Sequence, residues 1–244
     1  MHEYIDKAAL YARIEERRNR WGISLSDYPI NILNMCKSFK YLIIQEAPFT
    51  TPGLRGIATK RELPNKSDII ILNSCRTDLE KAFDCTHELI HLAEHRQVKA
   101  QSFHCFEKIL PQQNAFLEWQ ANEGAAEMLV PYMLLLQMIN ERKNYLQSWR
   151  GISGLNKLIA EYFNVSEAVI SFRFESLKYE INQLLEGCPI DRIKILSSKK
   201  QSQLGIRSKS LNDIAIELMS SEMYNIYVTA EDKELLDQLK LGRV

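Results

Sequence analysis

The residues with the clearest chemical potential lie in the stretch D-C-T-H-E-L-I-H-L-A-E-H, which runs from Asp84 to His95. It contains the pattern His-Glu-x-x-His in His87, Glu88 and His91. An α-helix repeats every 3.6 residues, so the two histidines would lie one turn apart on one face and could bind the same metal ion. Glu88 would project beside them, where it could accept a proton from a water molecule that the metal activates. On a helix, this spacing therefore predicts metal-assisted hydrolysis.

The sequence before the motif favours a helix. Thr77 and Glu80 have the spacing of a capping box, in which each side chain accepts a hydrogen bond from the backbone amide of the other residue. Apolar residues then recur at helical spacing, at Leu79, Phe83, Ile90 and Ala93. The motif would lie about three turns into this helix. The competing interpretation is that His87 and His91 are surface histidines on a solvated helical face.

A catalytic zinc ion needs a third protein ligand and one open coordination position. His95 continues the spacing, but each further turn lies about 6 Å along a straight helix, so three stacked histidines do not converge on one ion. We therefore expect His95 near the site or at the surface. The downstream segment L-E-W-Q-A-N-E-G-A-A-E-M-L-V-P offers three carboxylates, at Glu118, Glu123 and Glu127. Glu118 and Asn122 would share a helical face, whereas Glu123 would point about 140° away from Glu118, and the residue types alone do not choose among the three.

Together, the two segments resemble the ImmA/IrrE family of metallo-endopeptidases. That family combines H-E-x-G-H with a downstream E-x-E-A-N-x-F-A-A-x-L-L-M-P. The resemblance implies that His87, His91 and Glu118 bind one zinc ion per chain and that Glu88 is the general base. This sequence departs from the family pattern at three positions, where Gln120 replaces a glutamate, Gly124 a phenylalanine and Ile90 a glycine.

The resemblance extends over about residues 25–185. The runs L-R-G-I-A-T-K and D-I-I-I-L-N resemble the strand pair before the motif, and N-V-S-E-A-V-I-S-F-R-F-E-S-L resembles a later helix. It implies an α+β, zincin-like fold that is mostly helical, with a small sheet beside the active-site helix. One of the two strand-like runs would present an edge to which an extended peptide could add. The residue that stabilises the oxyanion stays open between Tyr132 and His104.

The other elements are predicted from periodicity and from capping and turn signals. We expect helices over residues 4–20, 115–130, 131–142, 154–163 and 164–185. We expect a helix from about residue 31 that leads into a strand at 41–44, and a hairpin formed by strands at 56–60 and 68–73. After Gly187 the sequence becomes polar and basic. We therefore predict a peptidase domain over 1–187 and a C-terminal extension over 188–244 with a helix–strand–helix order.

The composition argues against several protein classes. Lysine and arginine together number 31, which equals the number of acidic residues, so no overall charge predicts binding to nucleic acid or to a membrane surface. No apolar run reaches about 18 residues, and the N-terminus lacks the pattern of a signal peptide. The five cysteines are scattered without a C-x-x-C spacing, which predicts neither a disulfide framework nor a zinc ribbon. We expect a cytoplasmic protein.

The resemblance implies a zinc-dependent endopeptidase that cleaves one specific protein, a transcriptional repressor of a phage, a mobile element or a stress response. Two alternatives stay open. The segment around Arg173 and Lys178 also has a helix-turn-helix pattern, although direct DNA binding is the weaker interpretation because these are its two basic residues. The protein could also be a non-cleaving zinc-site regulator that binds a repressor or DNA, with residues 188–244 as a sensor or docking element. The sequence names neither the substrate nor the bond that is cut.

Overall fold

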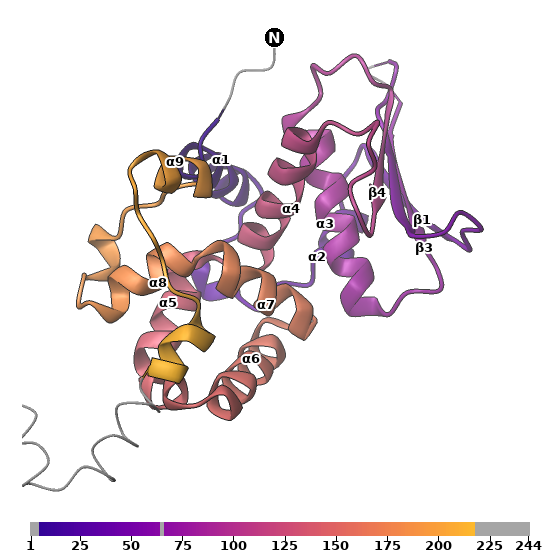
Figure 1. Ribbon diagram of the computed structural model, residues 1–244. Coiled ribbons are helices and arrows are strands. Elements are labelled where there is room, and N and C mark those ends of the chain that lie inside the picture. Colours follow the sequence, from indigo (N-terminus) through magenta and orange to yellow (C-terminus); the bar gives the residue numbers. More distant parts are fainter. Residues whose placement is uncertain (1–4, 64–65, 218–244) are drawn as a thin grey trace, which may run out of the picture.

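The computed structural model describes residues 5–63 and 66–217, and it places a small sheet on one side of a group of helices (Figure 1). The four strands are β1 (Leu42–Ala47), β2 (Leu54–Thr59), β3 (Asp68–Asn73) and β4 (Ser102–Phe106). Their order in the sheet is β1-β3-β2-β4. β2 and β3 form the predicted antiparallel hairpin, and β1 runs parallel to β3. The expected α+β, zincin-like fold, mostly helical with a small sheet, is confirmed.

Strand β4 was not predicted, and it corrects the expectation about the sheet edge. β2 and β3 lie in the interior of the sheet, so neither G-I-A-T-K nor D-I-I-I-L-N presents an edge. Within the described residues the edges are β1 and β4, and β4 pairs with β2. Phe103 and Cys105 are buried and His104 is exposed, which is the two-residue alternation of a strand with one covered face.

The motif lies on helix α3 (Asp78–Glu94), which packs against β2, β3 and β4. Thr77 caps the helix, and both hydrogen bonds of the predicted capping box with Glu80 are present. The central part of the helix is buried on nearly every side. His87 and His91 are 1% and 0% exposed, so the interpretation that they are surface histidines is wrong.

Helix α4 (Ala115–Leu129) packs against α3, and α1 (Lys7–Arg20) packs against α4. Gly124 allows this close approach. A Cβ atom added to Gly124 would lie 3.2 Å from Ile14 Cδ1 and 3.2 Å from Ile90 Cγ2. Ile90 therefore occupies the space that the missing side chain of Gly124 leaves, and two of the three departures from the family pattern meet at this contact.

The other helices lie away from the sheet (Figure 1), except α2, which packs against α3 and β1. They are α2 (Ile32–Lys37), α5 (Tyr132–Glu141), α6 (Trp149–Phe163), α7 (Glu167–Ser176), α8 (Lys178–Leu185) and α9 (Ser198–Gln203). The helix predicted over 164–185 is thus two helices, which meet at the non-helical residue Leu177. The carbonyl of Ser176 accepts a hydrogen bond of 2.5 Å from Lys7 Nζ. No helix within the described residues has the length and apolar composition to cross a membrane.

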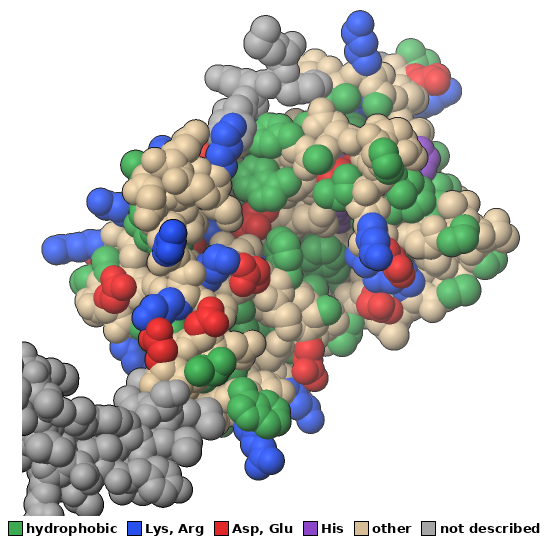
Figure 2. All heavy atoms as spheres, viewed as in Figure 1, with side chains coloured by type: hydrophobic (Ala, Val, Ile, Leu, Met, Phe, Trp, Pro, Cys, Tyr) green, Lys and Arg blue, Asp and Glu red, His purple; other side chains and the backbone are tan. Residues whose placement is uncertain are grey.

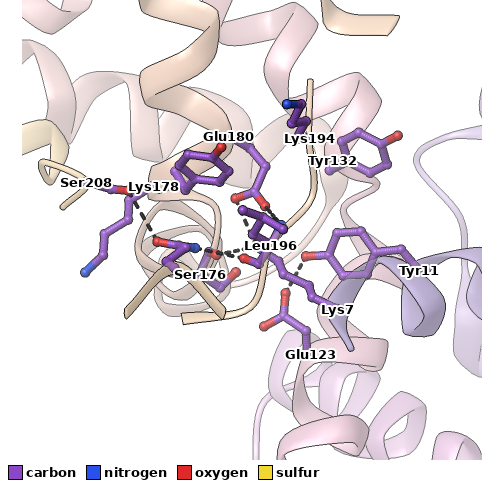
Figure 3. Close-up of polar contacts among 12 residues, drawn as sticks. Lys7, Tyr11, Glu123, Tyr132, Ser176, Lys178, Glu180, Lys194, Leu196 and Ser208 are labelled. Carbon is purple, nitrogen blue, oxygen red and sulfur yellow. Dashed lines mark hydrogen bonds and ion pairs between the residues drawn. The ribbon is translucent and has the colours of Figure 1, made fainter. Parts of the chain in front are cut away.

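The described part of the C-terminal extension packs on the same helical core. Ile193, Leu211 and Ala215 are buried with the core residues of the preceding helices. The amide of Leu196 donates to Glu180 Oε1 at 3.1 Å, and Figure 3 shows this contact beside Lys7. Residues 211–217 are helical, whereas the predicted strand at 224–229 and the last helix lie outside the described residues. The division of the chain after residue 187 stays a prediction.

Candidate metal centre

Three ligating side chains from two helices converge on one point. His87 Nε2 lies 3.1 Å from His91 Nε2 and 3.3 Å from Glu118 Oε2. His91 Nε2 lies 3.6 Å from Glu118 Oε1. Ligand atoms held about 2.0–2.2 Å from one tetrahedral ion lie roughly 3.3–3.6 Å from one another. The three side chains therefore fit a divalent metal ion, and the described part of the chain contains no second group of this kind.

The protonation states of the three side chains also suit a metal ion. Burial lowers the pKa of His91 to about 4, so its imidazole is neutral at physiological pH. Burial alone would raise the pKa of Glu118, but hydrogen bonding to His87 and His91 outweighs it and lowers the pKa to about 2. A metal ion binds neutral imidazole and ionised carboxylate, so little proton release has to accompany binding at these two residues.

The three carboxylates of α4 separate as helical geometry requires. Glu118 faces the two histidines of the motif. Glu123 and Glu127 lie on another face, where they contact Arg173 at 3.1 Å and 2.6 Å. The alternatives that the sequence left open for the third ligand are thus placed away from the histidines, and Glu118 is the residue that the fold brings to them.

The same contacts bear on the helix-turn-helix interpretation. Arg173 is 0% exposed, so it has no access to a DNA backbone or base edge. Lys178, the other basic residue of this segment, forms an ion pair with Glu175. The pattern in the sequence is therefore explained by the packing of α6 and α7 into the helical core.

Glu88 lies in the same buried region. Its Oε1 accepts a hydrogen bond of 3.0 Å from the amide of Cys105 on β4, and its Oε2 has no hydrogen-bond partner among the described residues. Burial raises the pKa of Glu88, although the Cys105 amide opposes this shift. Gly56 on β2 makes room for the side chain, since an added Cβ would lie 3.2 Å from both Cγ and Oε1 of Glu88. A free carboxylate oxygen with a raised pKa suits a group that accepts and returns a proton.

Three further side chains contact the two histidines of the motif, and one of them, His95, was expected near the site or at the surface. The outer nitrogen of His87, Nδ1, lies 3.0 Å from Asn122 Oδ1, and the outer nitrogen of His91 lies 2.8 Å from His95 Nδ1. Phe103 of β4 stacks on the His91 ring with centroids 4.5 Å apart. The helical spacing placed Asn122 on the face of Glu118. The place of Phe103 beside His91 was not predicted, because strand β4 was not predicted.

Two cavities lie beside the metal centre, one along β4 and one next to the residue that follows β4. One, of about 340 Å³, lies between β4 and the start of α4, and the other, of about 360 Å³, lies between β2, α3 and α7. The first is lined by residues that include Phe103, His104, Leu117 and Glu118, and the second by residues that include Arg55, Phe83, Asn122 and Phe172. Figure 2 shows a hollow near the middle of the face that it presents, with hydrophobic side chains around it.

The two candidates for stabilising the oxyanion lie in different places. His104 lines the cavity beside Glu118. Tyr132 stacks on Tyr11 with ring centroids 5.6 Å apart, and its amide donates to Glu127 Oε2. Of the two, only His104 shares a cavity with a candidate metal ligand.

A match to a known protein family agrees with this geometry. A family described as the IrrE N-terminal-like domain, a peptidase family, matches residues 42–175. A solved structure of a Mycobacterium tuberculosis transcriptional regulator is 12% identical, with a TM-score of 0.45, and the match covers 69% of this chain and 47% of that one. The chain thus spans about half of the length of that regulator. A search of curated proteins gave no match. Because the family match covers more than half of the chain, the protein belongs to the family of IrrE N-terminal-like domains and carries a metallopeptidase-type domain.

Proposed function

We propose that the protein is a zinc-dependent endopeptidase that cleaves a specific protein substrate. The convergence of His87, His91 and Glu118 beside the free Oε2 of Glu88 is the observation that carries this proposal. Two imidazoles and one carboxylate are a common ligand set of catalytic zinc, and they leave a coordination position open. When bound, zinc supplies Lewis-acid polarisation of the scissile carbonyl and lowers the pKa of water.

Glu88 would move the protons of the reaction. Its Oε2 would accept a proton from the attacking water and then donate it to the nitrogen of the leaving amine. The hydrogen bond from the Cys105 amide holds Oε1, so the carboxylate presents its other oxygen to the reacting groups. This division between a held and a free oxygen supports the proposed role of Glu88 as the general base.

The substrate would bind along β4 in an extended conformation. β4 is an edge strand beside the site, and an extended peptide can add to such an edge through main-chain hydrogen bonds. The two cavities beside the metal centre would accept substrate side chains on either side of the scissile bond. This arrangement favours an unfolded loop or linker as the cleaved segment.

The proposed substrate is a transcriptional repressor, which is the class that the family resemblance implies. Cleavage of the repressor would relieve repression. All five cysteines are free, which agrees with the reducing environment of the cytoplasm as the proposed location.

The test combines metal analysis with cleavage of a peptide library that is derived from a digested proteome and read by mass spectrometry. The wild-type protein should contain about one zinc ion per chain and cut the library, and Glu88→Gln should keep the zinc and lose the cleavage. Glu161→Gln, at an exposed position on α6, is the matched control and should behave like the wild type. Zinc binding without cleavage of the library or of intact lysate proteins would instead favour the non-cleaving regulator.

A further inference from the structure

The outer nitrogen of His91 begins a chain of hydrogen bonds that ends on α4. His91 Nδ1 lies 2.8 Å from Nδ1 of His95, the residue that caps the end of α3. His95 Nε2 lies 2.9 Å from Gln120 Oε1. His91, His95 and Gln120 are 0%, 3% and 5% exposed, so water has little access to compete for these bonds.

The chemistry of the groups allows one arrangement of protons along this chain. A metal ion takes the lone pair of His91 Nε2, so the neutral ring carries its proton on Nδ1. That proton needs an acceptor, and the facing Nδ1 of His95 must therefore be unprotonated. Neutral His95 then carries its proton on Nε2 and donates it to the amide oxygen of Gln120, which only accepts.

The reversed arrangement fails at the His91 end of the chain. If Gln120 presented its NH₂ group, His95 Nε2 would have to be unprotonated and Nδ1 would carry the proton. His95 Nδ1–H would then need a lone pair on His91 Nδ1, which would move the proton of His91 to Nε2, the nitrogen that faces His87 and Glu118. A protonated Nε2 cannot bind a metal ion.

We propose that His95 and Gln120 are positioning residues for the metal centre, which fix the tautomer and the ring orientation of His91 so that its Nε2 lone pair faces the ion. This inference rests on the proposed metal centre and deepens it. Hydrogen bonds to the outer nitrogen of a ligating histidine commonly have this effect on metal affinity. At His87 a single residue would have this role. Its Nδ1 would donate a hydrogen bond to Oδ1 of Asn122, which lies 3.0 Å away.

The test measures the zinc affinity of the full-length protein by competition with a chromophoric chelator. His95→Phe and Gln120→Leu should each lower the affinity roughly 10- to 100-fold. Gln120→Glu keeps an oxygen acceptor and should return the affinity to within a few-fold of the wild type. Gln137→Leu makes the same change as Gln120→Leu at an exposed position on α5 and serves as the matched control, with wild-type affinity expected.

A second readout does not depend on bound metal. In the metal-free protein, ¹⁵N NMR of labelled histidines should show His91 protonated on Nδ1, and in Gln120→Leu it should show a mixture of the two tautomers. Unchanged zinc affinity and an unchanged tautomer in His95→Phe and Gln120→Leu would overturn the inference. A wild type that binds no zinc would contradict the proposed function instead, and the tautomer would still decide whether the chain orients His91.

Discussion

Helix α4 carries buried carboxylates on two of its faces, and the two groups differ in what surrounds them. On one face Glu118 lies beside His87 and His91, and within the described residues these two imidazoles are its ion-pair neighbours. On another face Glu123 and Glu127 lie beside Arg173, and Arg18 Nη1 is 3.2 Å from Glu127 Oε1. Tyr11 completes this cluster, with its hydroxyl directed at Glu123 (Figure 3).

The difference shows how a buried acid can be assigned a role. Burying a carboxylate is costly unless a positive charge and hydrogen bonds compensate for the lost hydration. The cluster of Arg173 has two guanidinium groups for two carboxylates, so the protein supplies the compensation itself. Glu118 contacts two imidazoles instead, of which His91 is neutral at physiological pH, and within the described residues no arginine or lysine forms an ion pair with it. The first arrangement joins α1, α4 and α7, whereas the second is suited to a cation.

The largest expected effect is on metal binding. Glu118→Ala removes one of the three proposed ligands and should lower zinc affinity more than the 10- to 100-fold that is typical for loss of a residue that hydrogen-bonds to a ligand. The free energy of unfolding of the metal-free protein should fall modestly, because the carboxylate loses its hydrogen bonds with His87 and His91. Chelator competition and urea unfolding in EDTA would measure the two effects. Zinc affinity at the wild-type level would show that Glu118 is not a ligand.

Replacing Arg173, which lies at the other face of α4, should affect the stability of the protein and not its metal binding. Arg173→Met leaves Glu123 and Glu127 with less positive charge and should lower the free energy of unfolding by about 3–5 kcal/mol. Zinc affinity of the folded protein should not change. The variant that also carries Glu123→Gln and Glu127→Gln should recover part of the stability. A loss of zinc at full stability would show that the two faces are not independent.

The pH dependence of stability should distinguish the site from the arginine cluster. Unfolded His91 takes up a proton at its ordinary pKa, whereas the folded residue resists protonation down to a pKa of about 4. The unfolded state therefore binds more protons between these values, and the metal-free protein should lose up to about 3 kcal/mol of stability as the pH falls from about 6.5 to 4. Urea unfolding at a series of pH values measures this slope. His91→Gln should flatten it, and an equally steep slope in that variant would assign the effect to other groups.

The smallest expected effect is at the contact between α3 and α4. Gly124→Val should lower the free energy of unfolding by about 1–3 kcal/mol, because the new side chain meets Ile14 and Ile90. Ile90→Ala should also be destabilising, since it removes buried apolar atoms. The double variant should lose less than the sum of the two, and strict additivity would show that the side chains do not share this space.

The features that the sequence predicts correctly depend on local patterns of residues. The capping box at Thr77, the periodicity of α3 and the His-Glu-x-x-His spacing all depend on residues a few positions apart, and all are found in the structure. Helical geometry also separates Glu118 from Glu123. Choosing Glu118 as the ligand required the family resemblance, because the partners of the other two carboxylates come from α1 and α7.

The features that the sequence did not predict depend on distant residues. Strand β4 exists through its pairing with β2, about 45 positions earlier, and its five residues have little pattern of their own. The break between α7 and α8 coincides with the bond from Lys7 to Ser176, which spans 169 positions. Likewise, the contact between His95 and Gln120 depends on how two helices pack, so the sequence around either residue does not predict it.

Strand β4 has two roles in the proposed reaction, because it would bind the substrate and it also contacts the side chains of the site. Its outer edge is the proposed binding surface for the peptide, while Cys105 holds the carboxylate of Glu88 and Phe103 stacks on His91. A mutation that adapts this strand to a different target therefore also disturbs the reacting groups. On the proposed function, selectivity and turnover cannot diversify independently in this protein. The two cavities beside the metal centre offer the freer route for change, since several of their lining residues have no hydrogen bond or ion pair with the proposed ligands.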